Sequence, residues 1–148
     1  MSTKISLQFK TKYDGELLQH GLHVRIIRVI TSAGFKTPNG WTIPFNAIVD
    51  TGNPVTILPE IAHRHIERKV LYPHPVSLYG VGKGQVSARL AEVEMLFVGQ
   101  RKNSPSLRLK AYLLPDDSLP VLIGFEDILT NLRFVSDYSR QRVQFEFR

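Results

Sequence analysis

The stretch Ala47-Ile48-Val49-Asp50-Thr51-Gly52 places an acidic residue directly after an apolar segment and two positions before a glycine. The segment is predicted to be a strand because apolar residues alternate strictly from Trp41 to Val49, although Pro44 indicates a sheet edge or a break in pairing. Gly52 allows a sharp backbone turn, so the Asp50 carboxylate can be held rigidly. Taken alone, Asp-Thr-Gly is more typical of a turn capped by its own side chains.

Period-two alternation continues along much of the chain and predicts strands at residues 4–10, 22–29, 86–98, 107–113, 119–123 and 143–147. A phase shift after Ile26 indicates a bulge or a bend in the second of them. Two segments are predicted to be helical, residues 59–70 and 125–132. Many short strands with little helix favour a single all-β domain over residues 1–148, built as a barrel or a sandwich.

The composition excludes several kinds of protein. A chain of 148 residues that is 43% hydrophobic can bury one core, and two independent domains would be a tight fit. The absence of cysteine excludes a disulfide scaffold, a thiol nucleophile and cysteine-rich zinc sites. Residues 1–17 lack the continuous apolar segment of a secretory signal, and no run approaches membrane-spanning length. We therefore expect a cytoplasmic protein with no membrane partner.

The formal charge of +6 raises the question of an acidic partner. The cations are scattered, however, and the densest stretch, His63 to Lys69, also contains Glu67. A solvated helix face explains that stretch better than a phosphate-binding patch, so no nucleic-acid partner is expected. A metal site built from His63, His65 and His74 is a further alternative, but two histidines two positions apart on a helix point to different faces. We expect no metal and no cofactor.

Three blocks of sequence, in this order, resemble the retropepsin family of aspartic proteases. The family's pattern is two apolar residues before Asp-Thr-Gly, then a glycine-rich flap hairpin, and then two apolar residues and a glycine before a short helix. The blocks are Ile48–Gly52, continued by the apolar run Val55–Leu58, then Leu78–Gly84, and then Leu122–Gly124. The resemblance spans roughly Leu22 to the C-terminus, and three ordered motifs are far more specific than one.

The resemblance implies a closed β-barrel of the retropepsin type with one or two short helices, and the activity of an aspartic endopeptidase on polypeptides. It assigns catalysis to Asp50. By the same resemblance Thr51 ties two catalytic loops together and Gly52 offers backbone groups to the substrate. The family's flap tip matches Gly80, Val81 and Gly82.

This chemistry needs two carboxylates that share one proton, and one chain supplies one such acid. No other aspartate is followed by Thr-Gly or Ser-Gly, so the second acid is expected from another copy in a homodimer. The apolar terminal strands could interleave in that dimer or could be ordinary barrel strands.

The sequence departs from the family at three places. Asn53 stands where the family usually has Ala or Ser, close enough to the acids to alter their hydrogen bonding. Pro54 and Phe125 stand where viral members carry an Asp and an Arg that brace the dimer. The alternative function is a catalytically silent member of the fold, a dimerisation or peptide-binding module that keeps Asp50 without turnover.

Overall fold

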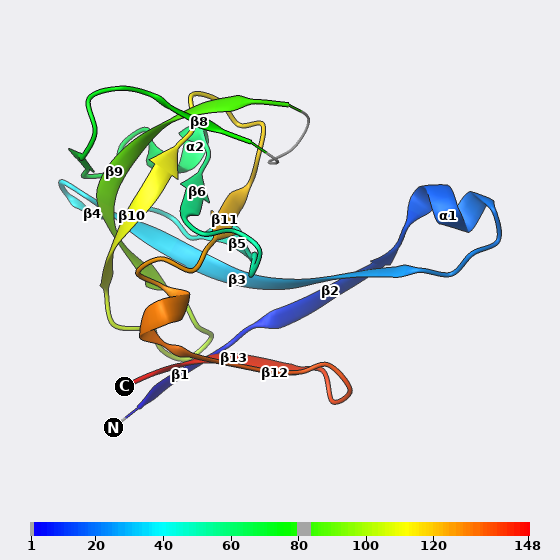
Figure 1. Cartoon of the computed structure of the whole chain (residues 1–148). Coiled ribbons are helices and arrows are strands. Elements are labelled where there is room, and N and C mark those ends of the chain that lie inside the picture. The colour runs from blue at the N-terminus through cyan, green and yellow to red at the C-terminus, as the bar shows by residue number, and fades with distance from the viewer. Residues whose placement is uncertain (1, 80–83) are drawn as a thin grey trace.

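β-Strands dominate the backbone of this chain, as its period-two alternation predicts (Figure 1). The structure is a computed structural model that describes residues 2–79 and 84–148. Its short helical elements are α1 (Gly15–Gln19), α2 (Glu60–His63) and the 3-10 turn η1 (Leu129–Asn131). Its strands are β1 (Thr3–Ser6), β2 (Gln8–Tyr13), β3 (Arg25–Thr37), β4 (Gly40–Trp41), β5 (Phe45–Val49), β6 (Thr56–Leu58), β7 (Lys69–Val70), β8 (Val76–Leu78), β9 (Val86–Phe97), β10 (Leu107–Leu113), β11 (Val121–Ile123), β12 (Arg133–Asp137) and β13 (Arg142–Phe147).

The central strands form a closed circuit of pairings. β3 pairs with β5, β5 with β11, β11 with β6, β6 with β10 and β10 with β9. β9 then returns to β3, with Ala33 opposite Phe97. A sheet whose last strand pairs with its first has closed on itself, so the expectation of an all-β, barrel-like domain is confirmed.

The core of this barrel comes from the alternation along its long strands. From Ala91 to Phe97, β9 buries Ala91, Val93, Met95 and Phe97, with half-exposed residues between them. β10 runs antiparallel to β9 and places its own buried residues opposite, for example Leu109 opposite Val93. Burying each large aliphatic or aromatic side chain stabilises the fold by about 1.5–3 kcal/mol, so this interior is the main source of stability.

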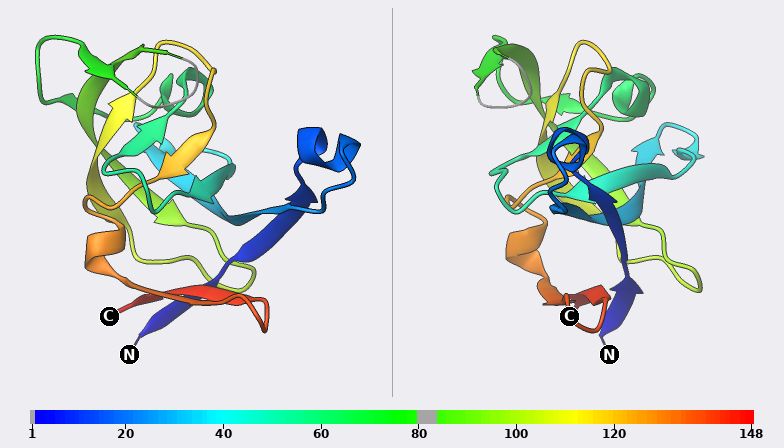
Figure 2. Two further views of the ribbon diagram at one scale, coloured as in Figure 1. Left: turned by 45° about the vertical axis from the view of Figure 1, so that its right-hand side comes forward. Right: turned by 90° about the vertical axis from the view of Figure 1, so that its right-hand side faces the viewer.

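A second, three-stranded sheet joins the two ends of the chain. Its strand order is β1–β13–β12, and Ile5 of β1 lies opposite Phe145 of β13. The Phe145 ring packs on Phe97 of the barrel with centroids 4.9 Å apart. The two termini therefore lie side by side beneath the barrel (Figure 2). Each terminal strand has its partner within the same chain, as ordinary barrel strands would.

The two helix predictions are wrong in extent. The segment 59–70 forms only the single turn α2, because the Glu67 amide then donates to the Lys36 carbonyl and Lys69–Val70 pairs with β9 as β7. The segment 125–132 contains turns and η1 rather than an α-helix. In it Asp127 adopts a left-handed backbone (φ 65°), which interrupts a right-handed helix.

The Asp127 carboxylate ties this irregular segment to β10. Its Oδ2 accepts a hydrogen bond from the Lys110 amide at 2.9 Å and lies 3.0 Å from the Lys110 ammonium. Burial of the carboxylate raises its pKa, but the bonds from Lys110 outweigh that effect and hold the pKa below its ordinary value. A carboxyl group whose pKa is lowered by folding stabilises the fold above about pH 4. That stabilisation is lost as the pH falls through the folded-state pKa.

We therefore expect Asp127→Asn to lower the free energy of unfolding by about 1–2 kcal/mol at pH 7, since asparagine tolerates the left-handed backbone but carries no charge. The difference from the wild type should shrink in acid, where the wild-type carboxylate is protonated too. Urea unfolding of both proteins across a pH series measures this. A difference that grew as the pH fell would contradict the assignment.

A two-stranded ribbon leaves the barrel and is the most prominent departure from the expected fold (Figure 1). β2 pairs with the first half of β3, and α1 closes the ribbon at its far end. We call residues 8–30 the arm. Asp14 caps α1 by accepting from the Leu17 amide at 3.0 Å, and α1 has no buried residue. Within the described ranges, no helix has both the length and the apolar character needed to cross a membrane.

Candidate active site

Asp50 lies at the end of β5, where the backbone is held on both sides. Its amide donates to the Ile123 carbonyl of β11 at 2.9 Å, and its carbonyl accepts from the Asn53 amide at 3.1 Å. The carboxylate is oriented by the turn that follows, since its Oδ1 accepts from the Gly52 amide at 3.0 Å. The predicted strand, acid and turn are thus present. The hydrogen bond from the Gly52 amide that caps the turn also holds the Asp50 carboxylate in place.

Gly124 brings the end of β11 against the loop that follows Asp50. Its amide donates to the buried Thr56 hydroxyl at 3.0 Å, and the next amide, that of Phe125, donates to the Asn53 carbonyl at 3.0 Å. A Cβ atom at Gly124 would lie 2.7 Å from the carbonyl carbon of Val55 and 2.8 Å from the carbonyl oxygen of Asn53. The glycine of the third sequence block is therefore needed for this close approach.

A groove of about 480 Å³ opens beside Asp50. The end of β5 and the start of the turn, Ile48 to Thr51, form its centre, and the base of the arm, Ile26 to Val29, forms one flank. The other flank is built by Leu119, Pro120 and Leu122, and β5 lies between β3 and β11 in the sheet. Most of the lining residues are apolar in type, although polar atoms form about half of the exposed lining, and the half-exposed Asp50 is the single acid that lines the groove among the described residues.

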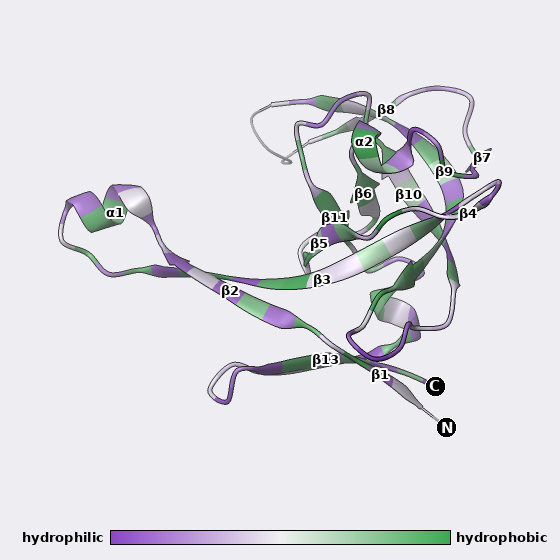
Figure 3. Ribbon diagram, turned by 180° about the vertical axis from the view of Figure 1, so that it is seen from behind, coloured by the Kyte–Doolittle hydropathy of each residue, from purple (hydrophilic) through white to green (hydrophobic). Residues whose placement is uncertain are grey.

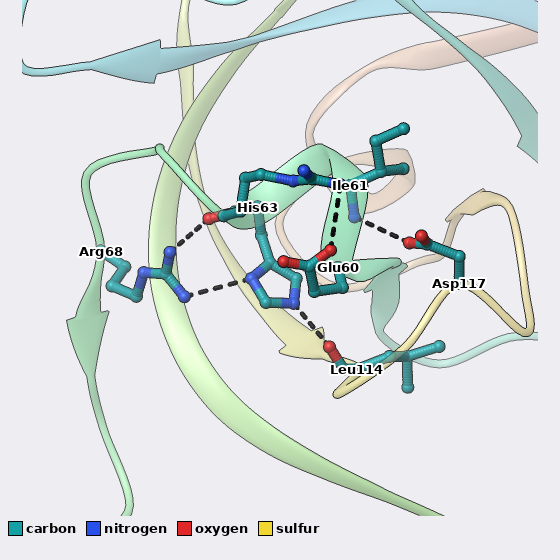
Figure 4. Close-up of polar contacts among 7 residues, drawn as sticks. Glu60, Ile61, His63, Arg68, Leu114 and Asp117 are labelled. Carbon is teal, nitrogen blue, oxygen red and sulfur yellow. Dashed lines mark hydrogen bonds and ion pairs between the residues drawn. The ribbon is translucent and has the colours of Figure 1, made fainter.

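The other aspartates serve local structure. Asp116 accepts from the Ser118 amide at 3.0 Å, and its hydrogen bonds with Ser118 lower its pKa. Asp117 accepts from the Ile61 amide at the start of α2 at 2.7 Å, as Figure 4 shows. Asp137 caps a turn, and its bonds from Ser139 and Arg140 lower its pKa. None of them lines the groove beside Asp50 in the described chain.

The remaining residues predicted for the site differ in what the structure says of them. Thr51 and Gly52 follow Asp50 directly and are both exposed, and Thr51 lines the groove. The predicted flap tip, Gly80, Val81 and Gly82, lies outside the described residues. The strands that lead to it, β8 and β9, pair antiparallel, with Leu78 opposite Val86.

Asn53 lies three residues after Asp50, and its carbonyl accepts from the Phe125 amide. Its side chain is buried, and its amide nitrogen has no hydrogen-bond partner within the described residues. A buried polar group left unpaired costs about 1–3 kcal/mol. Asn53 does not line the groove, so this unpaired amide is a local cost within the loop after Asp50.

The histidine alternative does not assemble into a site. His63 is buried on α2, and its Nε2 lies 2.6 Å from the Leu114 carbonyl oxygen (Figure 4). Because a carbonyl only accepts, Nε2 carries the proton; Nδ1 then accepts from the Arg68 guanidinium at 3.1 Å. His65 and His74 are exposed. No group of three or more potential metal ligands gathers anywhere in residues 2–79 and 84–148.

Comparisons with known proteins bear on the fold. No protein-family model matches the chain, and no curated protein matches it. Among solved structures, it is similar to a retropepsin-like aspartic protease from Rickettsia conorii, with a TM-score of 0.56 and 14% sequence identity. The match covers 99% of this chain and 92% of the other. The chain therefore shares the fold of a retropepsin-like aspartic protease.

Proposed function

We propose that this protein is an aspartic endopeptidase that hydrolyses peptide bonds with a pair of Asp50 carboxylates, one from each copy of a homodimer. The observation that carries the proposal is the placement of Asp50. It stands at the end of a core strand, is oriented by the Gly52 amide, and faces an open groove lined mainly by apolar residues. The resemblance of the three ordered sequence blocks and the shared fold support the same function.

The chemistry explains why one copy is not enough. In the reaction, one ionised carboxylate takes a proton from the attacking water, while the neutral carboxyl group donates a hydrogen bond to the substrate carbonyl. Two like charges at hydrogen-bonding distance cannot both ionise freely, so the pair titrates in two coupled steps. The groove holds one acid from this chain. A two-fold axis beside Asp50 supplies the second.

The other site residues take supporting roles in this proposal. Thr51 ties the two catalytic loops together across the axis, and the Gly52 backbone contacts the substrate. Gly80, Val81 and Gly82 form the tip of a flap that closes over an extended polypeptide. The apolar groove walls, Ile48 and Leu122 among them, suit apolar substrate side chains.

The test is digestion of a denatured protein mixture by the purified wild type, with and without pepstatin. We expect cleavage that pepstatin blocks, and a specific activity per protomer that falls on dilution as the dimer dissociates. A rate per protomer that stayed constant well below the dimer dissociation constant would contradict the shared site. Binding of peptides with no cleavage at any pH would identify the alternative, a silent peptide-binding module of the same fold.

A further inference from the structure

The arm carries an accumulation of positive charge on one face. In the β2–β3 register Lys10 lies directly opposite Arg28, and Lys12 lies opposite Ile26, two positions further along the same face. Like charges that face each other across two strands destabilise the pairing. Within the described residues, no carboxylate forms an ion pair with Lys10, Lys12 or Arg28. This face therefore suits an acidic partner.

The arm also lacks the burial that would keep it ordered alone. Its exposed apolar side chains are Tyr13, Leu18, Leu22, Val24 and Ile27. Figure 3 shows that the ribbon and α1 extend away from the barrel, with hydrophobic and hydrophilic residues interspersed. An isolated two-stranded ribbon is marginally stable in water, and α1, with five residues, is too short to be stable alone. Both features indicate a surface that another molecule covers.

The base of the arm forms one flank of the groove beside Asp50. The second copy that brings its own Asp50 to this groove therefore lies next to the arm. Ile26 to Val29 flank one side of β5, and Leu119 to Leu122 flank the other. Directly before the second flank lie Asp116 and Asp117, whose carboxylates accept backbone N–H groups and take part in no ion pair of the described chain. The groove thus lies between the arm, whose Arg28 lines it, and a loop whose two acids lie just outside it.

A two-fold axis beside Asp50 leaves two ways for these flanks to meet. If each flank met its own symmetry mate, the cations of two arms would face one another, and so would the acids of two loops. If each flank met the opposite flank, cations would face acids. Only the second arrangement is electrostatically complementary.

We infer that the arm of each copy clasps the second copy, placing Lys10, Lys12 and Arg28 over the partner's Asp116–Asp117 loop. This inference rests on the proposed function, because it assumes that two Asp50 carboxylates meet. The arm then stabilises the dimer in which the catalytic pair forms. It replaces the bracing charges of viral members, since Pro54 and Phe125 stand at those two positions in this chain.

The test is a charge exchange measured by analytical ultracentrifugation at low ionic strength. We expect Lys10→Glu with Lys12→Glu to raise the dimer dissociation constant about tenfold. Asp116→Lys should raise it as well, and combining all three substitutions should restore much of the affinity. Lys69→Glu with Lys102→Glu is the matched control, since it reverses the same charge away from the arm and should leave the dimer unchanged.

A second variant tests the apolar end. Replacing residues 14–24 with Asn-Gly joins Tyr13 to Arg25 by a two-residue hairpin and removes α1, which packs on no core residue. It should weaken the dimer about tenfold or more and leave the thermal unfolding of the barrel unchanged.

The outcomes separate the arm from the active site. A wild-type dimer whose affinity is unaffected by both arm variants would overturn the clasp and leave the proposed protease intact. Variants that lose binding to short duplex DNA or to anionic vesicles, but dimerise normally, would also overturn it. A wild type that is monomeric at every concentration and still cleaves would overturn both the clasp and the shared catalytic pair.

Discussion

Replacing Gly124 with alanine is expected to lower the free energy of unfolding by about 3 kcal/mol or more. The added Cβ would lie 2.7 Å from the Val55 carbonyl carbon, 2.8 Å from the Asn53 oxygen and 3.0 Å from the Thr56 nitrogen. All three are backbone atoms, so no side chain can rotate to make room. The loop after Asp50 and the end of β11 would have to separate, breaking the hydrogen bonds that join them.

Urea unfolding measures this loss, and Gly15→Ala is the matched control. Gly15 starts α1, and a Cβ there meets no atom within 4 Å. Its substitution should change the free energy of unfolding by no more than about 0.5 kcal/mol. If the two alanine variants had equal stability, the tight approach of β11 to the Asp50 loop would be wrong.

The barrel could be predicted from the sequence because alternation reports burial directly. β10, and β9 from Ala91 onward, have one face in the core and one in solvent, so Val86–Phe97 and Leu107–Leu113 match the predicted strands closely. The closure of the sheet could not be predicted in this way. It depends on the pairing of β3 with β9, and alternation says which face is buried but not which strand lies alongside.

The arm could not be predicted, for a physical reason. The phase shift after Ile26 predicts a bulge or a bend, whereas the pairing of β3 (Arg25–Thr37) with β2 has no bulge. Outside the barrel neither face of the ribbon is buried in this chain, so apolar residues occupy both faces and alternation fails. The start of α1 did carry a signal, because Asp14 before Gly15 and Glu16 is typical of a helix N-terminus.

The helix predicted at residues 125–132 is wrong because contacts distant in sequence determine the backbone there. Its spacing suited a helix, but the left-handed Asp127 and its bonds to Lys110 decide the backbone there. The acid at the end of β5 followed from local sequence. The groove did not, because its flanks come from the arm and from β11, which are distant in sequence.

Asp50→Asn is expected to lower the rate of peptide cleavage by at least about 1,000-fold while the barrel and the dimer remain intact. An amide cannot take a proton from water, and it has the size and hydrogen-bonding acceptor needed to keep the bond from the Gly52 amide. Cleavage assays, thermal unfolding and sedimentation of the variant measure the three properties. Retention of most of the activity would exclude Asp50 as the catalytic acid.

The same variant distinguishes a shared site from one complete in each chain. Because subunits exchange at random, a mixed dimer carries one aspartate and one asparagine and is expected to be inactive. A ninefold excess of Asp50→Asn should therefore reduce the activity of a fixed amount of wild type to about one tenth once exchange is complete. Gly15→Ala, which keeps Asp50, is the control and should not inhibit. If the wild type kept its full activity in the presence of the excess, each chain would have to cleave peptides with its own acid alone.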